Sequence, residues 1–250
     1  LSLDRSRLLK KNYMKKFILL LTLISSCSPD IEKQASTDQN WDTYLGDPGR
    51  SHYSNLSEFT AENVGQLALA WTYDSGEMRE GNSTMYTSPL VIDGVLYGLS
   101  PKLVAFALDA ATGEELWRSN YVGPGAAQRG LMWWEDGEDR RIIYPAGSEL
   151  IALNADTGQP IRRFGVNGRI NLKPEDKEVP FFTSVPGVVF EDKLILGFST
   201  AESANSQAGM IRAFDARSGA EVWRFNSLPR EGGLGSDTWQ EGSLEDSGGA

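Results

Sequence analysis

The sequence predicts an all-β protein, a β-propeller built from four-stranded blades, and three observations support that prediction. A short motif occurs three times, as LDAATGEELW at 108–117, LNADTGQPIRRF at 153–164 and FDARSGAEVW at 214–223. Strand-like segments, without helical periodicity, surround each copy. The motif glycines stand at 113, 158 and 219, so their spacings are 45 and 61 residues. Four-stranded repeats of about 40–50 residues are typical of propeller blades.

Each blade can be assembled strand by strand. The run before each motif is apolar or alternating, which predicts strands at 102–108, 149–154 and 210–215. Further upstream, a strand, a turn and a second strand are predicted within Thr87–Gly98, Arg140–Ser148 and Thr183–Gly197. A return strand begins near Trp117 and Trp223. The longer second spacing predicts insertions, mainly at 171–181 and 202–209.

The motif itself predicts a tight turn between two strands. Asp109, Asn154 and Asp215 can cap this turn through a side-chain oxygen. The glycine four residues later can adopt the positive φ that such a turn requires. The repeated motif is therefore expected to have a structural role, as a turn, and not a catalytic one.

Composition limits the possible functions. The chain has 250 residues and is 40% hydrophobic, which is enough to bury a sizeable core. Its net charge of −10 argues against broad contact with nucleic acid. The single histidine, His52, excludes a histidine-cluster metal site and is expected to be a loop residue. The single cysteine, Cys27, excludes a disulfide within the chain.

The residues before Cys27 have the pattern of an export signal. Lys15 and Lys16 precede the short apolar run 17–24, and small residues follow. The run is short for a membrane-spanning helix. Ile24-Ser25-Ser26-Cys27 resembles a bacterial lipobox, which implies lipidation of Cys27 and a membrane anchor. An ordinary signal peptide with a chance cysteine is the alternative.

Three regions are expected along the chain. Residues 1–27 comprise an upstream extension and the lipoprotein-type signal, with Met14 as the expected natural start. Residues 28–40 are polar and form a tether. Residues 41–250 form the propeller part. The last residues, 245–250, have the composition of a loop, so the chain is expected to be the N-terminal fragment of a longer protein.

The motif Asp-Ala-x-Thr-Gly-x-x-x-Trp resembles the tryptophan-docking repeat of the quinoprotein dehydrogenases, eight-bladed propellers that hold pyrroloquinoline quinone (PQQ). The resemblance runs from about Trp41 to Ala250, which corresponds to about four of the eight blades, and 59–76 resembles the family's opening segment. It implies that Trp117 and Trp223 pack between blades, as a large planar side chain can. The middle copy has Arg162 at the tryptophan position, so that contact must be made differently.

The resemblance also implies cofactor-binding residues. Arg129-Gly130 matches an Arg-Gly pair that faces PQQ carboxylates, and the alternative is a surface arginine in a glycine-rich loop. The phrase STAE matches a cofactor and Ca²⁺ loop, with Ser199, Thr200 and Ala201 toward PQQ and Glu202 as the metal ligand. The alternative for Glu202 is a solvated loop carboxylate. Thr183 matches a threonine near the quinone, or simply begins a strand.

Two departures from the family pattern bear on the site. Adjacent cysteines precede the Arg-Gly pair in many alcohol-oxidising relatives, whereas this chain has VGPGAAQRG there. Tyr86 stands where many members have a glutamate, which removes one cofactor contact. Trp133 and Trp134 could stack on a ligand, although packing is the expected role of both.

The resemblance implies a PQQ- and Ca²⁺-dependent dehydrogenase of the cell envelope. Its substrate would be an alcohol or a sugar, and its electron acceptor ubiquinone or cytochrome c. The family's base, the tryptophan below PQQ and an asparagine metal ligand are expected beyond Ala250, so this fragment alone should be inactive. The alternative is a non-enzymatic propeller lipoprotein that acts as an outer-membrane assembly scaffold.

Overall fold

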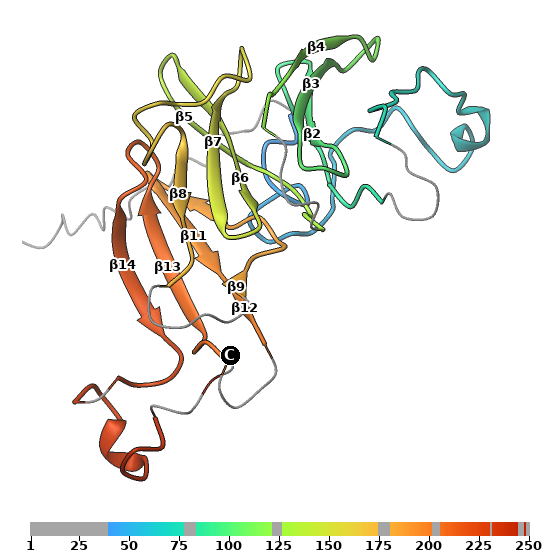
Figure 1. The fold of residues 1–250 in the computed structure, drawn as a ribbon. Helices are drawn as coiled ribbons and strands as arrows, with labels where there is room; N and C mark the ends of the chain where they lie inside the picture. The colour runs from blue at the N-terminus through green and yellow to red at the C-terminus, as the bar shows by residue number, and fades with distance from the viewer. Residues whose placement is uncertain are drawn as a thin grey trace, which may run out of the picture. The chain divides into compact units, whose positions relative to one another are not determined.

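The computed structural model describes residues 40–77, 84–121, 127–174, 181–201, 206–230, 232–244 and 248. These residues form three four-stranded antiparallel sheets, and the strands of each sheet follow one another in chain order (Figure 1). The predicted all-β architecture of four-stranded units is therefore confirmed. The signal segment with Cys27 lies outside the described residues, as do all but the last residue of the tether.

The first sheet contains β1 (Leu90–Ile92), β2 (Val95–Leu99), β3 (Ala105–Asp109) and β4 (Glu115–Arg118). The second contains β5 (Met132–Asp136), β6 (Asp139–Ala146), β7 (Glu149–Asn154) and β8 (Arg169–Asn171). The third contains β10 (Val188–Phe190), β11 (Lys193–Gly197), β13 (Met210–Asp215) and β14 (Glu221–Asn226).

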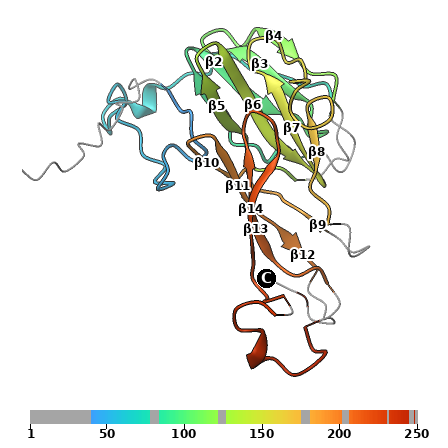
Figure 2. The same ribbon diagram turned by 90° about the vertical axis from the view of Figure 1, so that its left-hand side faces the viewer.

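Only short elements lie outside these sheets. Strands β9 (Phe181–Phe182) and β12 (Ser199–Thr200) pair with each other beside the third sheet (Figure 2). Two single-turn 3₁₀ helices are η1 (Val64–Gln66) and η2 (Ser236–Thr238). None of the helices in the described ranges has the length and apolar composition needed to cross a bilayer.

One predicted segment was wrong. Arg140–Ser148 was expected to contain a strand, a turn and a second strand, but it lies almost entirely in the single strand β6. The turn falls earlier, at Gly137, whose φ of +61° favours glycine. The first strand of this sheet is therefore β5, which begins at Met132. Its tryptophans and two acidic residues do not form an obvious strand pattern.

The two ends of each sheet differ because the strands alternate in direction. The turn end carries the motif turns between the third and fourth strands. The opposite end, called the loop end below, carries the segments that lead into β1, β5 and β10 and the connections between the second and third strands. The candidate cofactor residues and the repeated motif therefore lie at opposite ends of the sheets.

The motif turns have the predicted geometry. Asp109 Oδ1 accepts hydrogen bonds from the backbone N–H (2.8 Å) and the hydroxyl (2.9 Å) of Thr112, and Asn154 and Asp215 cap their turns in the same way. These bonds, chiefly the one from the Thr112 hydroxyl, hold the pKa of Asp109 below its ordinary value. Gly113 closes the first turn with a φ of +75°.

Tryptophans join the sheets at these turns. Trp117 donates through Nε1 to the Ala155 carbonyl at 2.8 Å, and its ring lies against Gly158. Packing of Trp117 between two sheets is thereby confirmed. Trp71, which precedes the first sheet, makes the same contact with the Ala110 carbonyl at 3.1 Å. Trp223 is 39% exposed, and no further sheet follows it in the described part of the chain.

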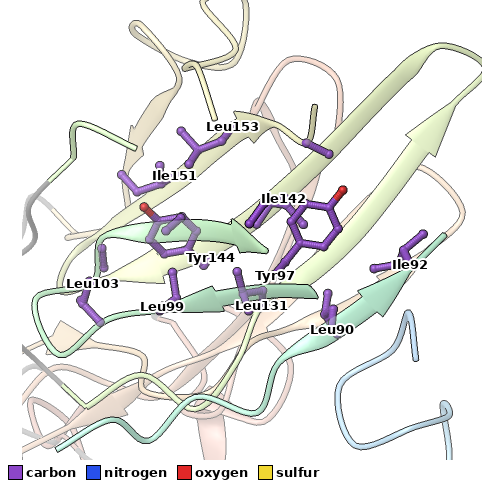
Figure 3. Packing of buried hydrophobic residues seen from close by; sticks show 14 residues of the cluster. Leu90, Ile92, Tyr97, Leu99, Leu103, Leu131, Ile142, Tyr144, Ile151 and Leu153 are labelled. Atoms are coloured by element: carbon purple, nitrogen blue, oxygen red, sulfur yellow. The ribbon is translucent and has the colours of Figure 1, made fainter. Parts of the chain in front are cut away.

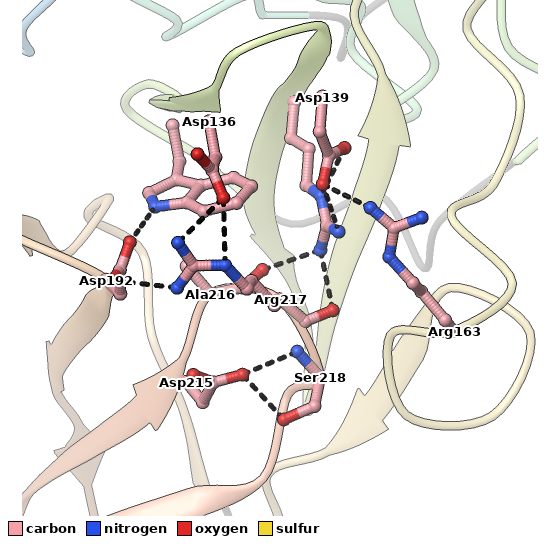
Figure 4. A network of polar contacts seen from close by, with 10 residues as sticks. Asp136, Asp139, Arg163, Asp192, Asp215, Ala216, Arg217 and Ser218 are labelled. Atoms are coloured by element: carbon pink, nitrogen blue, oxygen red, sulfur yellow. Dashed lines mark hydrogen bonds and ion pairs between the residues drawn. The ribbon is translucent and has the colours of Figure 1, made fainter.

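At the junction of the second and third sheets, an arginine replaces the tryptophan (Figure 4). Arg141 on β6 is fully buried and donates through Nη1 to the carbonyls of Ala216 (2.6 Å) and Arg217 (2.8 Å). Ala216 holds the motif position of Ala110 and Ala155, so the guanidinium supplies the hydrogen bond that an indole supplies elsewhere. The prediction that this contact is made without a tryptophan at the motif position is confirmed.

Polar groups surround Arg141 on its remaining sides. The Asp139 carboxylate accepts hydrogen bonds from Arg141 Nε (3.0 Å) and Arg141 Nη2 (2.7 Å). These bonds lower the pKa of the Asp139 carboxyl. Arg163 binds the same carboxylate from the surface. The guanidinium carbons of Arg141 and Arg217 lie 4.9 and 5.1 Å from the ring centroid of Trp134. Cation–π contacts of this kind add to the junction.

The apolar contacts of this junction come from elsewhere on the second sheet. An ideal Cβ on Gly219 would lie 2.8 Å from Ile170 Cγ2 and 3.3 Å from Phe164 Cε2. Trp134 is 3% exposed and donates to Asp192 at 3.2 Å, which agrees with a packing role. These side chains belong to the core between the second and third sheets.

A separate core fills the space between the first and second sheets (Figure 3). Tyr97 stands near its centre, with its ring 6.1 Å from that of Trp117 and 5.8 Å from that of Trp133. The predicted packing role of Trp133 is therefore confirmed. Small residues, among them Ala105 and Ala107, allow the sheets to approach closely.

Candidate functional site

Main-chain hydrogen bonds connect the three sheets at the loop end. The Ser88 N–H donates to the Arg129 carbonyl, and the Arg129 N–H donates to the Ser184 carbonyl, both at 2.9 Å. The Thr87 hydroxyl adds a bond to the Gln128 carbonyl at 3.1 Å. The segments that lead into β1, β5 and β10 therefore run side by side, which places Arg129 beside the start of the third sheet.

Arg129 and Gly130 differ sharply in their surroundings. The Arg129 side chain is exposed, and no ion pair between described residues includes it. Gly130 is buried. An ideal Cβ there would lie 2.6 Å from Tyr44 Cδ2 and 3.3 Å from Pro186 Cγ, so the glycine permits close packing under the arginine.

The STAE loop begins on the small β9–β12 ladder. Ser199 pairs with Phe182 and Thr200 with Phe181, which places both hydroxyl-bearing residues opposite the two residues that precede Thr183. Ser199 is exposed, whereas Thr200 and Ala201 are partly buried. The predicted metal ligand Glu202 lies outside the described residues.

Phe198 anchors this loop to the third sheet. Its ring stacks on that of Phe181 with centroids 4.5 Å apart. The guanidinium carbon of Arg212 lies 5.7 Å from the Phe198 centroid, and Arg212 donates to the Leu172 carbonyl at 2.6 Å. Burial lowers the pKa of Arg212, and Glu221 opposes that shift through an ion pair at 2.6 Å. Sequence reasoning missed this anchor, because nothing in the local pattern links position 212 to position 198.

Thr183 lies in a more closed environment than the other candidates. It is 4% exposed, and its hydroxyl donates to the Val185 carbonyl at 3.0 Å. This local bond stabilises the turn between β9 and β10. Tyr86, at the position where many relatives have glutamate, is 57% exposed near the same loop end.

The loop end thus carries the exposed cation of Arg129 together with several hydroxyl and main-chain groups. Arg129 can bind a carboxylate through a planar pair of N–H donors. Ser199 and Thr200 can donate to or accept from a polar ligand. Donors of these kinds are suited to an anion that carries carboxylates. Among the described residues, no group of three or more metal-binding side chains forms a metal site.

Comparison with known proteins gives a consistent result. Residues 41–250 match the family model described as the β-propeller domain of PQQ glucose, ethanol and alcohol dehydrogenases. The quinoprotein glucose dehydrogenase of Escherichia coli K12 is 27% identical over 232 residues. A quinohemoprotein alcohol dehydrogenase of Pseudomonas putida is 31% identical over 199 residues. These alignments cover 82% and 76% of this chain.

Solved structures show a similar arrangement of strands. The crystal structure of quinohemoprotein alcohol dehydrogenase from Comamonas testosteroni matches with a TM-score of 0.62 and 27% identity over 78% of this chain. The chain spans 28% of that structure, and 29% and 26% of the two relatives above. It therefore corresponds to somewhat under a third of each of these proteins.

Proposed function

Because this chain belongs to the family of PQQ glucose, ethanol and alcohol dehydrogenase β-propellers, we propose that it forms part of an enzyme that oxidises the CH–OH group of an alcohol or a sugar. The observation that carries the proposal is the loop end, where hydrogen bonds place the exposed Arg129 beside the third sheet. A scaffold protein would need no such convergence of cation and hydroxyl groups, so the dehydrogenase is favoured over that alternative.

Each candidate residue has a distinct part in the proposal. Arg129 binds a carboxylate of PQQ, and Gly130 allows the main chain below it to pack closely. Ser199 and Thr200 hydrogen-bond the polar edge of the cofactor, with Ala201 leaving room beside them. Thr183 lies near the quinone, and its bond to the Val185 carbonyl holds the turn between β9 and β10 in place. Bound PQQ supplies the capacity to accept two electrons from a substrate.

We extend the proposal to Ca²⁺ and the electron acceptor. Glu202 directly follows the described part of the STAE loop and offers the hard oxygen ligand that Ca²⁺ prefers. A bound cation there acts as a Lewis acid. Ubiquinone or cytochrome c receives the electrons at the cell envelope.

Substitution of Arg129 tests the cofactor site. We expect Arg129→Ala to raise the Kd for PQQ by about 10- to 100-fold, since a hydrogen bond to a charged group contributes about 1.5–3 kcal/mol. The Kd of Arg129→Lys should lie between those of the unaltered protein and Arg129→Ala, because lysine keeps the charge and loses the planar pair of donors. Fluorescence titration of the cofactor-free enzyme of which this chain forms part measures these constants.

The control is Arg162→Ala, which removes an exposed arginine that follows the motif turn of the second sheet. We expect its Kd for PQQ to match that of the unaltered protein. Equal affinities for Arg129→Ala and Arg162→Ala would contradict the placement of the cofactor at the loop end.

The proposed envelope location depends on Cys27. We expect Cys27→Ser to abolish incorporation of a labelled fatty acid and to move the protein from the membrane fraction to the soluble fraction, because the acylated thiol is the proposed anchor. Ser26→Ala keeps a small residue before the cysteine and should retain the label. Labelling of the Cys27→Ser protein would show that the anchor lies elsewhere.

A further inference from the structure

An N-terminal strap, Trp41–His52, crosses the starts of the sheets. Trp41 is fixed on the first sheet, since it exchanges two main-chain hydrogen bonds with Val91 at 2.7 and 3.1 Å. The strap then folds back on itself, and its His52 N–H donates to the Leu45 carbonyl at 3.1 Å. The segment between these bonds carries Tyr44 toward the loop end.

The ring of Tyr44 packs on Gly130, and Pro186 lies near the same glycine. The Cβ position of Gly130 is 2.6 Å from Tyr44 Cδ2, and Pro186 Cγ lies 3.3 Å from the same position. Gly130 directly follows Arg129, and Pro186 lies two residues after Ser184. The ring therefore contacts the main chain next to the Arg129–Ser184 hydrogen bond.

Space remains beside the strap. A cavity of about 90 Å³ separates it from the first residues of β5 and β10, with Tyr44, Arg50, Trp133 and Val188 among its lining residues. The exposed Arg50 guanidinium lies 5.4 Å from the Tyr44 ring centroid. Because the packing here is incomplete, truncation of Tyr44 enlarges an existing space and leaves Gly130 without its neighbour.

We propose that Tyr44 is a positioning residue for the cofactor site. Its ring holds the Arg129–Gly130 main chain against the Ser184–Pro186 segment, and this contact directs the Arg129 side chain. The effect on the cofactor rests on the proposed function, whereas the effect on the main chain is a property of the cofactor-free protein. The contact involves the ring carbons of Tyr44, so phenylalanine should preserve it.

The first test is hydrogen exchange in the cofactor-free protein, measured by mass spectrometry. In Tyr44→Ala we expect amide exchange in peptides spanning 86–90 and 127–131 to accelerate by about tenfold, because the Ser88 and Arg129 N–H groups donate the flanking hydrogen bonds and these bonds open more often. Peptides across the motif turn at 108–118 should not change. Tyr44→Phe should behave as the unaltered protein, and Tyr44→Leu tests the same point if the alanine variant does not fold.

The second test is the Kd for PQQ. We expect it to rise about tenfold in Tyr44→Ala and to stay unchanged in Tyr44→Phe, since small misplacements of a binding group weaken a site substantially. Tyr53→Ala is the matched control, because Tyr53 is 70% exposed just beyond the strap. It should alter neither measurement.

The outcomes separate the two proposals. Faster exchange together with weaker PQQ binding supports the positioning role. Unchanged exchange in both Tyr44→Ala and Tyr44→Leu overturns that role, whatever the PQQ affinity. Faster exchange in this chain, combined with no PQQ binding by the unaltered enzyme of which it forms part, overturns the proposed function and leaves the positioning of the main chain supported.

Discussion

Arg141→Ala should lower the free energy of unfolding by about 3–5 kcal/mol, the usual cost of removing one member of a buried ion pair. The substitution removes the two hydrogen bonds to the Ala216 and Arg217 carbonyls at the junction of the second and third sheets. It also leaves the Asp139 carboxylate, whose side chain is 19% exposed, without its buried partner. Urea unfolding of the purified protein, followed by circular dichroism, measures the loss.

Arg163→Ala is the matched control, because Arg163 binds the same Asp139 carboxylate from a position that is 65% exposed. Exposed ion pairs of this kind contribute about 0–1 kcal/mol. A loss above about 2 kcal/mol in Arg163→Ala, or below about 1 kcal/mol in Arg141→Ala, would contradict the assignment of the junction to the buried guanidinium.

The ion pair at this junction predicts that the stability of the protein depends on pH in the acid range. The pKa of Asp139 is lower in the folded protein than in the unfolded chain, chiefly because of its bonds to Arg141. Its contribution is fully present above the ordinary value of 3.8 and is lost as the pH falls through the lower folded pKa. Arg141→Ala should therefore show a shallower loss of stability below pH 3.8 than the unaltered protein.

Gly158→Ala should lower the free energy of unfolding by about 3 kcal/mol, through two effects that act together. Gly158 has a φ of +67°, which disfavours a side chain. An ideal Cβ there would lie 2.5 Å from Trp117 Cε3, so the indole would have to move from the turn on which it packs. The Trp117 hydrogen bond to Ala155 would weaken with it.

Gly94→Ala separates the two effects. Gly94 has a similar φ of +79°, but no atom lies within 4 Å of its ideal Cβ position. The free energy of unfolding of Gly94→Ala should therefore fall only by the backbone cost of about 1–2 kcal/mol. The difference between the variants in thermal or urea unfolding reports the packing of Trp117 on Gly158. Equal losses would show that the indole does not press on this turn.

The predictable part of the fold is the part that repeats. The motif predicted the Asx-capped turns and the positive φ of Gly113 and its equivalents, because each depends on residues within a few positions. The contact of Trp117 with the next sheet was predicted by the family resemblance, since its partner Ala155 is distant in the sequence. Trp71 makes the same contact without a motif before it. The only available signal was the apolar run 67–70 ahead of it, which resembles a return strand.

Arg141 lay beyond sequence reasoning for a physical reason. A docking tryptophan follows the motif turn of its own sheet, whereas Arg141 reaches the next turn from β6, the second strand. A side-chain donor to the alanine carbonyl of the motif turn can thus come from different strands. Only the three-dimensional structure shows which strand supplies it. Tyr44 was missed for the same reason, since its contact with Gly130 spans 86 residues of sequence.

The candidate site was predicted only in outline. The resemblance identified Arg129 and the STAE loop, and the structure brings Arg129 to the segment that contains Thr183 and Ser184. The β9–β12 ladder was not expected, because two-residue strands have no periodicity to detect. The ring of Phe198, just before β12, stacks on that of Phe181 in β9 and so packs against the ladder.

The bonds that join Ser88, Arg129 and Ser184 have a consequence for how such a protein can change over generations. They use only main-chain N–H and C=O groups, so any residue except proline can stand at position 88 or 129 without breaking them. The side chains at these positions can therefore be exchanged while the main-chain hydrogen bonds persist. The main-chain arrangement can thus stay the same while the side chains at these positions change.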